Sequence, residues 1–256
     1  MSSCRATNAK ARQAMMLFDD EGPDRDRWAA HDADFTPLPV IRQGLACVLR
    51  LVQCHGSSAW TPRKALDPSA GAGAFGMVFR ELLPLCHTTG VEVREEEREH
   101  VMRNYDQALI CSFQDLQTQV ADLVATNPPW GTAWSQIARE WIPLADVVAL
   151  LGPTTWGHSD EPAEALDLFE QHPPWCCLRI PGRVQFRTGT NPRTGTKYSA
   201  DNRKVAWWVW ADGVMPLVRN VGDVVPDMPA FATITLPRLP KEDRRWTTRP
   251  GTEETR

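Results

Sequence analysis

The sequence predicts an α/β fold with a mostly parallel sheet and a C-terminal antiparallel hairpin. Short apolar runs alternate with amphipathic segments over much of the chain, and this alternation is typical of parallel strands joined by helices. A glycine-rich turn directly follows the first short apolar run, as it does where a strand leads into a helix. In the last third, two strand-like segments flank a loop rich in Gly, Thr and Arg, which predicts the hairpin.

The individual elements follow from hydrophobic spacing and from turn residues. Helices are expected at Val40–Gln53, Met77–Pro84, Glu95–Ala108, Trp134–Pro143 and Ala163–Gln171. Strands are expected up to Leu66 and at Thr88–Val93, Asp122–Thr126, Asp146–Leu151, Leu178–Phe186 and Val205–Trp210. The last two of these strands would form the hairpin at the edge of the sheet.

Three parts are expected along the chain. Residues 1–34 are polar and rich in Asp and Arg, and they predict a loosely ordered leader. Residues 35–212 carry the α/β pattern and form the expected main domain. Residues 213–256 have many prolines and little periodicity, which predicts a proline-rich C-terminal extension.

Composition argues against several classes of protein. The seven cysteines form no C-x-x-C pair, so neither a zinc site nor a disulfide framework is expected, and a reducing cytoplasm is the natural compartment. The six histidines show no metal-ligand spacing, so no metal is expected. No apolar run approaches the roughly 20 residues of a membrane span, and Met1–Lys10 lacks the apolar stretch of a signal peptide.

Charge is distributed unevenly along the chain. The net charge of −4 argues against a strongly basic nucleic-acid binder. Residues 183–204 nevertheless contain six basic side chains and a single acid, Asp201. The basic residues are Arg183, Arg187, Arg193, Lys197, Arg203 and Lys204. This loop either contacts a polyanion or is the solvated tip of a hairpin.

Two motifs carry the functional prediction. The first is the turn Asp67–Gly76, and the second is Asn127-Pro128-Pro129-Trp130 directly after a predicted strand. Ligands of an open α/β sheet bind outside the carboxyl ends of its strands, and glycines let the backbone approach a nucleotide-like ligand. The G-x-G-x-x-G spacing alone is weak and would also suit a dinucleotide. If each motif is considered alone, the first could be an ordinary strand–helix turn and the second a loop breaker.

The residue types of the second motif suit transfer to an exocyclic amine. The lone pair of such an amine is delocalised into the ring, which makes it a poor nucleophile. The side-chain oxygen of Asn127 and the carbonyl of Pro128 can accept its two protons, and Pro129 helps to stiffen the turn so that these acceptors are preorganised. Trp130 would stack on a base flipped out of a duplex.

In this order the motifs resemble the adenine-N6 DNA methyltransferases, particularly the small stand-alone enzymes of phages and prophages. The likeness covers about residues 34–212. It implies a Rossmann-like class I fold that uses S-adenosylmethionine (SAM) as cofactor and methylates adenine-N6 in DNA. Asn127, Pro128, Pro129 and Trp130 would be the catalytic residues.

The resemblance also implies which residues contact SAM. Thr36 lies in a segment that closes over the methionine part, Glu92 would bind the ribose hydroxyls, and Asp115 with Leu116 would hold the adenine. The remaining implied contacts are Asp67, Pro68, Ala70, Gly71, Gly73, Phe75 and Asn127. Without the resemblance, Thr36 could simply start a turn, Glu92 could be a solvated strand-end acid, and Asp115 could be a surface acid.

The substrate is less sharply defined than the fold. The family often has a second acid two residues after the ribose ligand, where this chain has Arg94, and no large target-recognition domain is expected after Trp210. Phosphate contacts are therefore expected from Arg187, Arg193, Lys197, Arg203 and Lys204. DNA is the favoured partner. RNA adenine, a protein glutamine, and a non-catalytic nucleic-acid-binding subunit with the same fold remain alternatives.

Overall fold

The computed structural model describes most of the predicted α/β region. It describes residues 35–55, 59–116, 121–129, 133–156, 168–169, 171–186, 204–211, 214 and 232–245. The predicted leader, most of the predicted helix Ala163–Gln171, Trp130, and the basic residues Arg187, Arg193, Lys197 and Arg203 lie outside the described residues.

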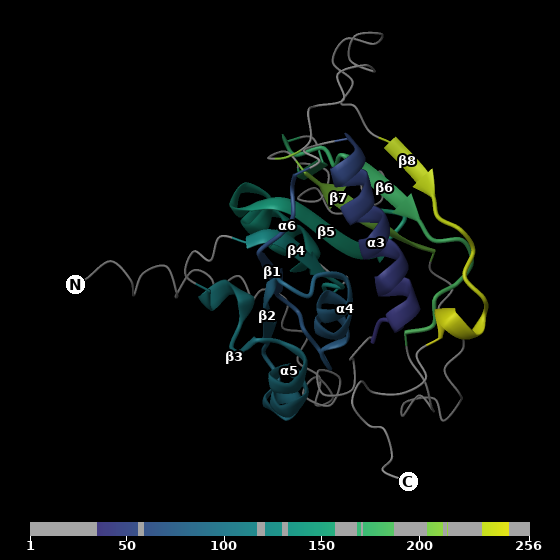
Figure 1. The fold of residues 1–256 in the computed structure, drawn as a ribbon. Helices are drawn as coiled ribbons and strands as arrows, with labels where there is room; N and C mark the ends of the chain where they lie inside the picture. Colours follow the sequence, from purple (N-terminus) through teal and green to yellow (C-terminus); the bar gives the residue numbers. More distant parts are fainter. Residues whose placement is uncertain are drawn as a thin grey trace, which may run out of the picture. The chain divides into compact units, whose positions relative to one another are not determined.

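The described residues form one sheet with helices on both of its faces (Figure 1). Its strands are β1 (Lys64–Asp67), β2 (His87–Glu92), β3 (Gln107–Ile110), β4 (Ala121–Thr126), β5 (Ala145–Pro153), β6 (Cys176–Arg179), β7 (Val205–Trp210) and β8 (Ala232–Thr235). The α-helices are α3 (Leu38–His55), α4 (Ala74–Leu82), α5 (Arg98–Asn104) and α6 (Ala133–Trp141). The 3₁₀ helices are η1 (Glu95–Glu97), η2 (Phe113–Asp115), η3 (Ile142–Leu144) and η4 (Glu242–Arg244).

The strand order is β3-β2-β1-β4-β5-β7-β6-β8. Strands β1 to β5 pair in parallel, whereas β7 is antiparallel to both β5 and β6. The predicted Rossmann-like fold class, a mostly parallel sheet with a C-terminal antiparallel hairpin, is therefore confirmed. The order reverses between β1 and β4, and a ligand of such a sheet binds at this point, outside the carboxyl ends of the strands.

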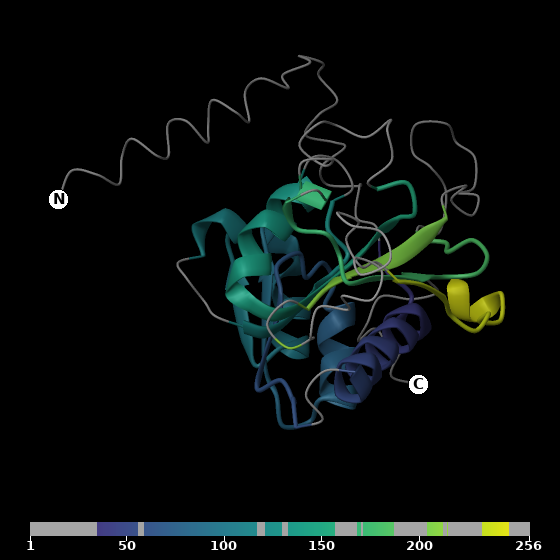
Figure 2. The same ribbon diagram turned by 90° about the horizontal axis from the view of Figure 1, so that it is seen from above.

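The sheet is covered by α3 and α4 on one face and by α6 on the other (Figure 2). Strand β7 shows how the sequence produces both layers. Alternate β7 side chains belong to the two different cores, Trp207 with the α3 side and Trp208 and Trp210 with the α6 side. Successive side chains of a strand point to opposite faces, so a strand buried on both faces reads as one continuous apolar run.

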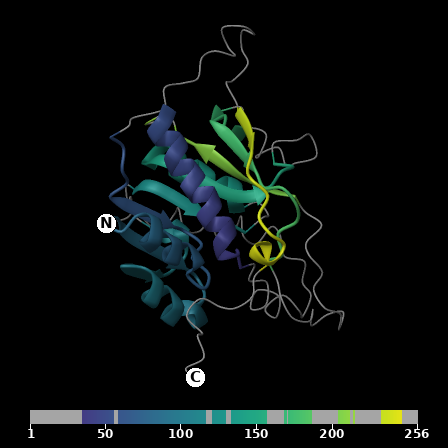
Figure 3. The same ribbon diagram turned by 45° about the vertical axis from the view of Figure 1, so that its right-hand side comes forward.

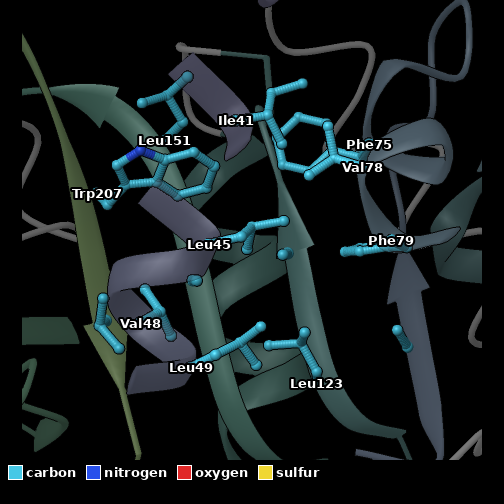
Figure 4. Packing of buried hydrophobic residues seen from close by; sticks show 14 of the residues in the cluster. Ile41, Leu45, Val48, Leu49, Phe75, Val78, Phe79, Leu123, Leu151 and Trp207 are labelled. Atoms are coloured by element: carbon cyan, nitrogen blue, oxygen red, sulfur yellow. The ribbon is translucent and has the colours of Figure 1, made fainter. Parts of the chain in front are cut away.

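Helix α3 crosses the sheet and packs its apolar stripe against α4 and the strands beneath (Figures 3 and 4). Ile41, Leu45 and Val48 recur at helical spacing and are fully or almost fully buried. Each such side chain stabilises the fold by roughly 1.5–3 kcal/mol. A Cβ at Gly44 would overlap the indole of Trp207, so glycine permits this close approach of helix and sheet.

The predicted single helix Glu95–Ala108 is wrong. The segment contains η1 and α5, and the chain then enters β3, which pairs with β2. The helix ends because Asp106 accepts hydrogen bonds from the backbone N and the Oγ1 of Thr88, both at 2.8 Å. These bonds hold the chain beside β2, where the short apolar run before Cys111 adds an edge strand.

The hairpin also differs from its prediction in detail. Val205–Trp210 is confirmed as a strand, but its partner is Cys176–Arg179 and not Leu178–Phe186. The hairpin does not form the sheet edge, because β8 pairs in parallel with β6 outside it. Strand β8 lies within the predicted extension, and its four residues are too few to give a periodic signal in the sequence. Among the described helices, none combines the length and hydropathy needed to cross a bilayer.

Candidate active site

The carboxyl ends of three neighbouring strands bring the predicted motifs together. Asp67 at the end of β1 pairs with Gly90 of β2, and Leu66 pairs with Val124 of β4. The glycine turn after β1, Glu92 at the end of β2 and the Asn127 segment after β4 therefore share one edge of the sheet. We call it the carboxyl edge, and it includes the point where the strand order reverses.

Positive backbone angles shape the glycine turn. Gly71 has φ 54° and Gly73 has φ 82°, a region that favours glycine. The turn is tied down by the backbone N–H of Ala70, which donates to the carbonyl of Val91 at 2.8 Å. A Cβ at Gly73 would lie 2.6 Å from Nδ2 of Asn104, whereas a Cβ at Gly71 would meet only Nη2 of Arg94, at 3.8 Å. The side of Gly71 on which a Cβ would lie is thus the open side of the turn.

Asp67, at the start of this turn, holds it in place through hydrogen bonds. It is fully buried; its Oδ1 accepts a hydrogen bond from the backbone N of Ser69 at 3.1 Å and its Oδ2 one from the hydroxyl of Tyr105 at 2.6 Å. Burial raises the pKa of Asp67 from 3.8 to about 6, although the Thr126 side chain and the hydrogen bonds from Tyr105 and Ser69 act to lower it. Burial and the neighbouring carboxyl likewise raise the pKa of Tyr105. Asp67 holds the loop in this structure, and its direct contact with a cofactor stays a prediction.

Glu92 is bound to the turn on one side and to Arg94 on the other. Its Oε2 accepts from the backbone N of Gly71 at 2.7 Å and from Nη2 of Arg94 at 3.2 Å. Its Oε1 accepts from the backbone N of Arg94 at 3.0 Å and from Nε at 2.9 Å. Burial acts to raise the pKa of Glu92, but the bonds and charge of Arg94 outweigh it and hold this pKa below its ordinary value.

The Asn127 segment leaves β4 toward α6. Asn127 is half-buried, Pro128 is buried and Pro129 is exposed. An aromatic group packs between α6, the end of β5 and β7. It consists of Trp134, Trp156, Phe169, Trp208 and Trp210. Trp134 and Trp156 are stacked with ring centroids 4.0 Å apart, and Phe169 meets Trp208 edge-on at 5.1 Å. This group fixes the start of the helix that follows the motif.

The other predicted site residues occupy varied environments. Thr36 is buried just before α3, and the neighbouring Phe35 N donates to the carbonyl of Phe186 at 3.2 Å. Asp115 is exposed and Leu116 half-buried after β3, whose end pairs with Glu92. Pro68, Ala70 and Phe75 are buried, with Phe75 packed edge-on against Trp207 in the core. Lys204, beside β7, is exposed.

Sequence reasoning missed Tyr105 and Asn104 and noted Arg94 only as a departure from the family pattern. All three contact the glycine turn or the acids beside it. No motif contains Tyr105 or Asn104, and their roles depend on how α5 returns to the sheet. The described residues include no group of His, Cys, Asp or Glu side chains arranged to hold a metal ion.

Comparisons with known proteins found similarity only among solved structures. No family model and no curated protein sequence matches the chain. The plantazolicin methyltransferase BpumL in complex with SAH shares 14% identity over 76% of this chain and 91% of its own, with a TM-score of 0.46. TrmN from Thermus thermophilus shares 19% identity over 73% of this chain and 52% of its own, with a TM-score of 0.43.

The METTL16 methyltransferase domain shares 12% identity over 65% of each chain, with a TM-score of 0.42. At such scores the backbones overlap in part. The fold assignment therefore rests on the strand order, and the candidate site is argued from the side chains at the carboxyl edge alone.

Proposed function

We propose that the protein is a SAM-dependent methyltransferase that transfers a methyl group to adenine-N6 in DNA. One observation carries the proposal. The parallel pairing of β2, β1 and β4 places the glycine turn, Glu92 and the Asn127 segment at one carboxyl edge. A cofactor site and an amine-binding turn at adjoining strand ends are what methyl transfer requires, because donor and acceptor must be held in line.

The residues present suit an adenosine-type cofactor. Gly71 exposes backbone on its open side, and the Glu92 carboxylate lies next to it, where it could accept hydrogen bonds from a ribose once the Arg94 guanidinium has moved away. Asp115 and Leu116 follow β3, which lies next to β2 in the sheet, and would flank the adenine. When bound, SAM supplies an electrophilic methyl group on a sulfonium.

The acceptor side would be provided by the turn after β4. The side-chain oxygen of Asn127 and the carbonyl of Pro128 would accept hydrogen bonds from the two amine protons, which favours tetrahedral character at the nitrogen. As the N–CH3 bond forms, the S–CH3 bond breaks, S-adenosylhomocysteine leaves, and one amine proton passes to solvent. Because the turn directly follows a buried strand, the acceptors would be preorganised. Trp130 would stack on the flipped base.

DNA is the proposed substrate because of the basic loop. Arg187, Arg193, Lys197, Arg203 and Lys204 would follow the phosphate backbone without reading bases. RNA adenine and a protein glutamine are alternative acceptors, since the same turn suits any planar amine or amide. A non-catalytic nucleic-acid-binding subunit is an alternative of a different class. The proposed compartment is the cytoplasm of the host cell.

Labelled SAM tests these options directly. The full chain is incubated separately with duplex DNA, RNA and a protein mixture, and the labelled product is hydrolysed and identified. The expected product is N6-methyladenine from DNA. The same nucleoside from RNA alone, or label in glutamine, would change the substrate. Tight SAM binding with no transfer to any acceptor would favour the non-catalytic alternative.

A further inference from the structure

The carboxylate of Glu92 has no acceptor position left for a ribose. A carboxylate offers about four lone-pair sites. Backbone N–H groups of Gly71 and Arg94 use one on each oxygen, and Nε and Nη2 of the Arg94 guanidinium use the others. The two backbone donors belong to the main chain and stay in place when side chains rotate. The guanidinium is the part that a side-chain rotation can remove.

The guanidinium also lies on the open side of the glycine turn. Nη2 of Arg94 lies 3.8 Å from the position of a Cβ at Gly71, and apart from Gly71 and its two chain neighbours no atom lies closer to that position. The side chain of Arg94 is only 20% exposed to solvent, and that of Glu92 is 6% exposed. An ion pair this sheltered is screened less by solvent than a surface pair. It therefore competes effectively with a neutral diol.

We propose that Arg94 is a gating residue, whose guanidinium closes the ribose acceptor Glu92 until a cofactor displaces it. This rests on the proposed function, because it assumes an adenosine ligand at the carboxyl edge. Cofactor affinity is set by the competition between the ribose hydroxyls and Arg94 for the same two carboxylate oxygens. Removing the guanidinium removes the competitor and leaves the acceptor in place.

Two acids that follow Arg94 in the chain also attract its side chain. Glu96 and Glu97 attract the Arg94 guanidinium together with Glu92, and these charges raise its pKa against the effect of burial. The displaced guanidinium thus stays close to negative charge. The same acids argue against Arg94 as a phosphate ligand, because a bound phosphate would lie beside negative charge.

The test is a set of titrations of the full chain with SAH, which cannot turn over. The variants are Arg94→Ala, Arg94→Lys, Glu92→Gln and the double variant Glu92→Gln/Arg94→Ala. Arg98→Ala is the matched control, because Arg98 pairs with Glu95 on the same segment but is exposed. Arg94→Ala is expected to bind SAH about tenfold more tightly, the equivalent of about 1.4 kcal/mol. Arg98→Ala should stay within about twofold of the parent.

Two further results separate gating from a structural role. In the Glu92→Gln background, Arg94→Ala should change the affinity little, because the neutral amide no longer holds the guanidinium. Arg94→Lys should lie between parent and Arg94→Ala, since an ammonium cannot form the bidentate pair. It also serves as the test variant if Arg94→Ala does not fold. In turnover assays the gain should appear as a lower KM for SAM with kcat little changed.

Equal or weaker SAH binding by folded Arg94→Ala would overturn the gate while leaving the proposed function standing. If Arg94→Ala bound SAH and the parent did not, the result would support a gate that keeps the parent's site closed. No binding of SAM or SAH by any folded variant would overturn the proposed function, and the gate with it. Adenosine 2′-phosphate is the last probe. Binding of this probe that disappears in Arg94→Ala would make Arg94 a phosphate ligand and not a gate.

Discussion

The two halves of the carboxyl edge are supported by different chemistry. The half proposed to bind the cofactor (the cofactor half) lies at the ends of β1 and β2 and depends on charge and hydrogen bonds: Tyr105 on Asp67 at 2.6 Å, and Arg94 on Glu92 at 2.9 Å. The half proposed to bind the methyl acceptor (the acceptor half) lies at the ends of β4 and β5 and is backed by the aromatic group, where Trp134 and Trp156 stack at 4.0 Å.

This difference has a physical consequence. Apolar packing involves no titrating group and is therefore insensitive to pH, and it loses stability in proportion to the volume removed. Buried polar pairs respond to protonation, and each depends on a few atoms in one arrangement. We therefore expect substitutions in the acceptor half to act through packing or chemistry. Substitutions in the cofactor half should act through protonation and through binding.

The largest effect is expected from Trp156→Ala in the acceptor half. Trp156 is 2% exposed, lies against Gly152 and stacks on Trp134, so its removal leaves a cavity that the neighbours cannot fill. The free energy of unfolding should fall by about 3–5 kcal/mol, measured by urea denaturation. Trp156→Phe should recover part of this loss at every pH. A loss that varied strongly with pH would break the comparison.

Asn127→Ala should affect turnover and not binding. Removing one preorganised acceptor lowers kcat by about 10²–10³, while the glycine turn and Glu92 keep their geometry. SAH affinity, measured by calorimetry, should stay at the parental value. Activity within twofold of the parent would show that Asn127 does not hold the amine. A parallel loss of SAH affinity would show that the two halves are not separable.

The sequence predicted the parts of this site that are contiguous in the chain. The glycine turn and the Asn127 segment each follow a buried strand, so alternation of apolar and polar runs was enough to place both at one edge. The supports of the cofactor half could not be predicted in this way. Tyr105 lies 38 residues from Asp67, and its contact exists only because α5 ends where β2 and β3 pair. The closure of Glu92 by Arg94 depends on a side-chain orientation.

Asp67 should give the cofactor half a measurable pH dependence. Its pKa is raised from 3.8 to about 6, so between these values the folded protein binds a proton that the unfolded chain has released. Stability from this group is therefore lost as pH rises through that window, by about 3 kcal/mol at about 1.36 kcal/mol per pH unit.

The measurement compares the parent with Asp67→Asn. The parent's free energy of unfolding relative to Asp67→Asn should fall between pH 4 and pH 6 and then stay level. The variant is needed as the reference because Glu92, whose pKa is lowered, acts in the opposite direction. Its contribution is present above its unfolded pKa and is lost as pH falls through its folded pKa. If the difference in free energy of unfolding between parent and Asp67→Asn rose with pH, the pKa of Asp67 would not be raised in the folded protein.

The smallest effect is expected from Tyr105→Phe, which removes one hydrogen bond and keeps the ring. The ring still packs against Gly76 and Gly90, so no cavity forms. At neutral pH the buried Asp67 carboxylate loses a donor, and a bond to a charged group contributes about 1.5–3 kcal/mol. We expect the lower end of that range, because Asp67 keeps the backbone N of Ser69 and takes up a proton more readily once Tyr105 no longer lowers its pKa.

The loss caused by Tyr105→Phe should therefore shrink at pH 5, where Asp67 is mostly protonated. It should also shrink in the Asp67→Asn background, where no charge is left for Tyr105 to stabilise. The same loss at both pH values and in both backgrounds would assign Tyr105 to packing, and the contrast between a polar and an apolar half would then rest on Glu92 and Arg94 alone.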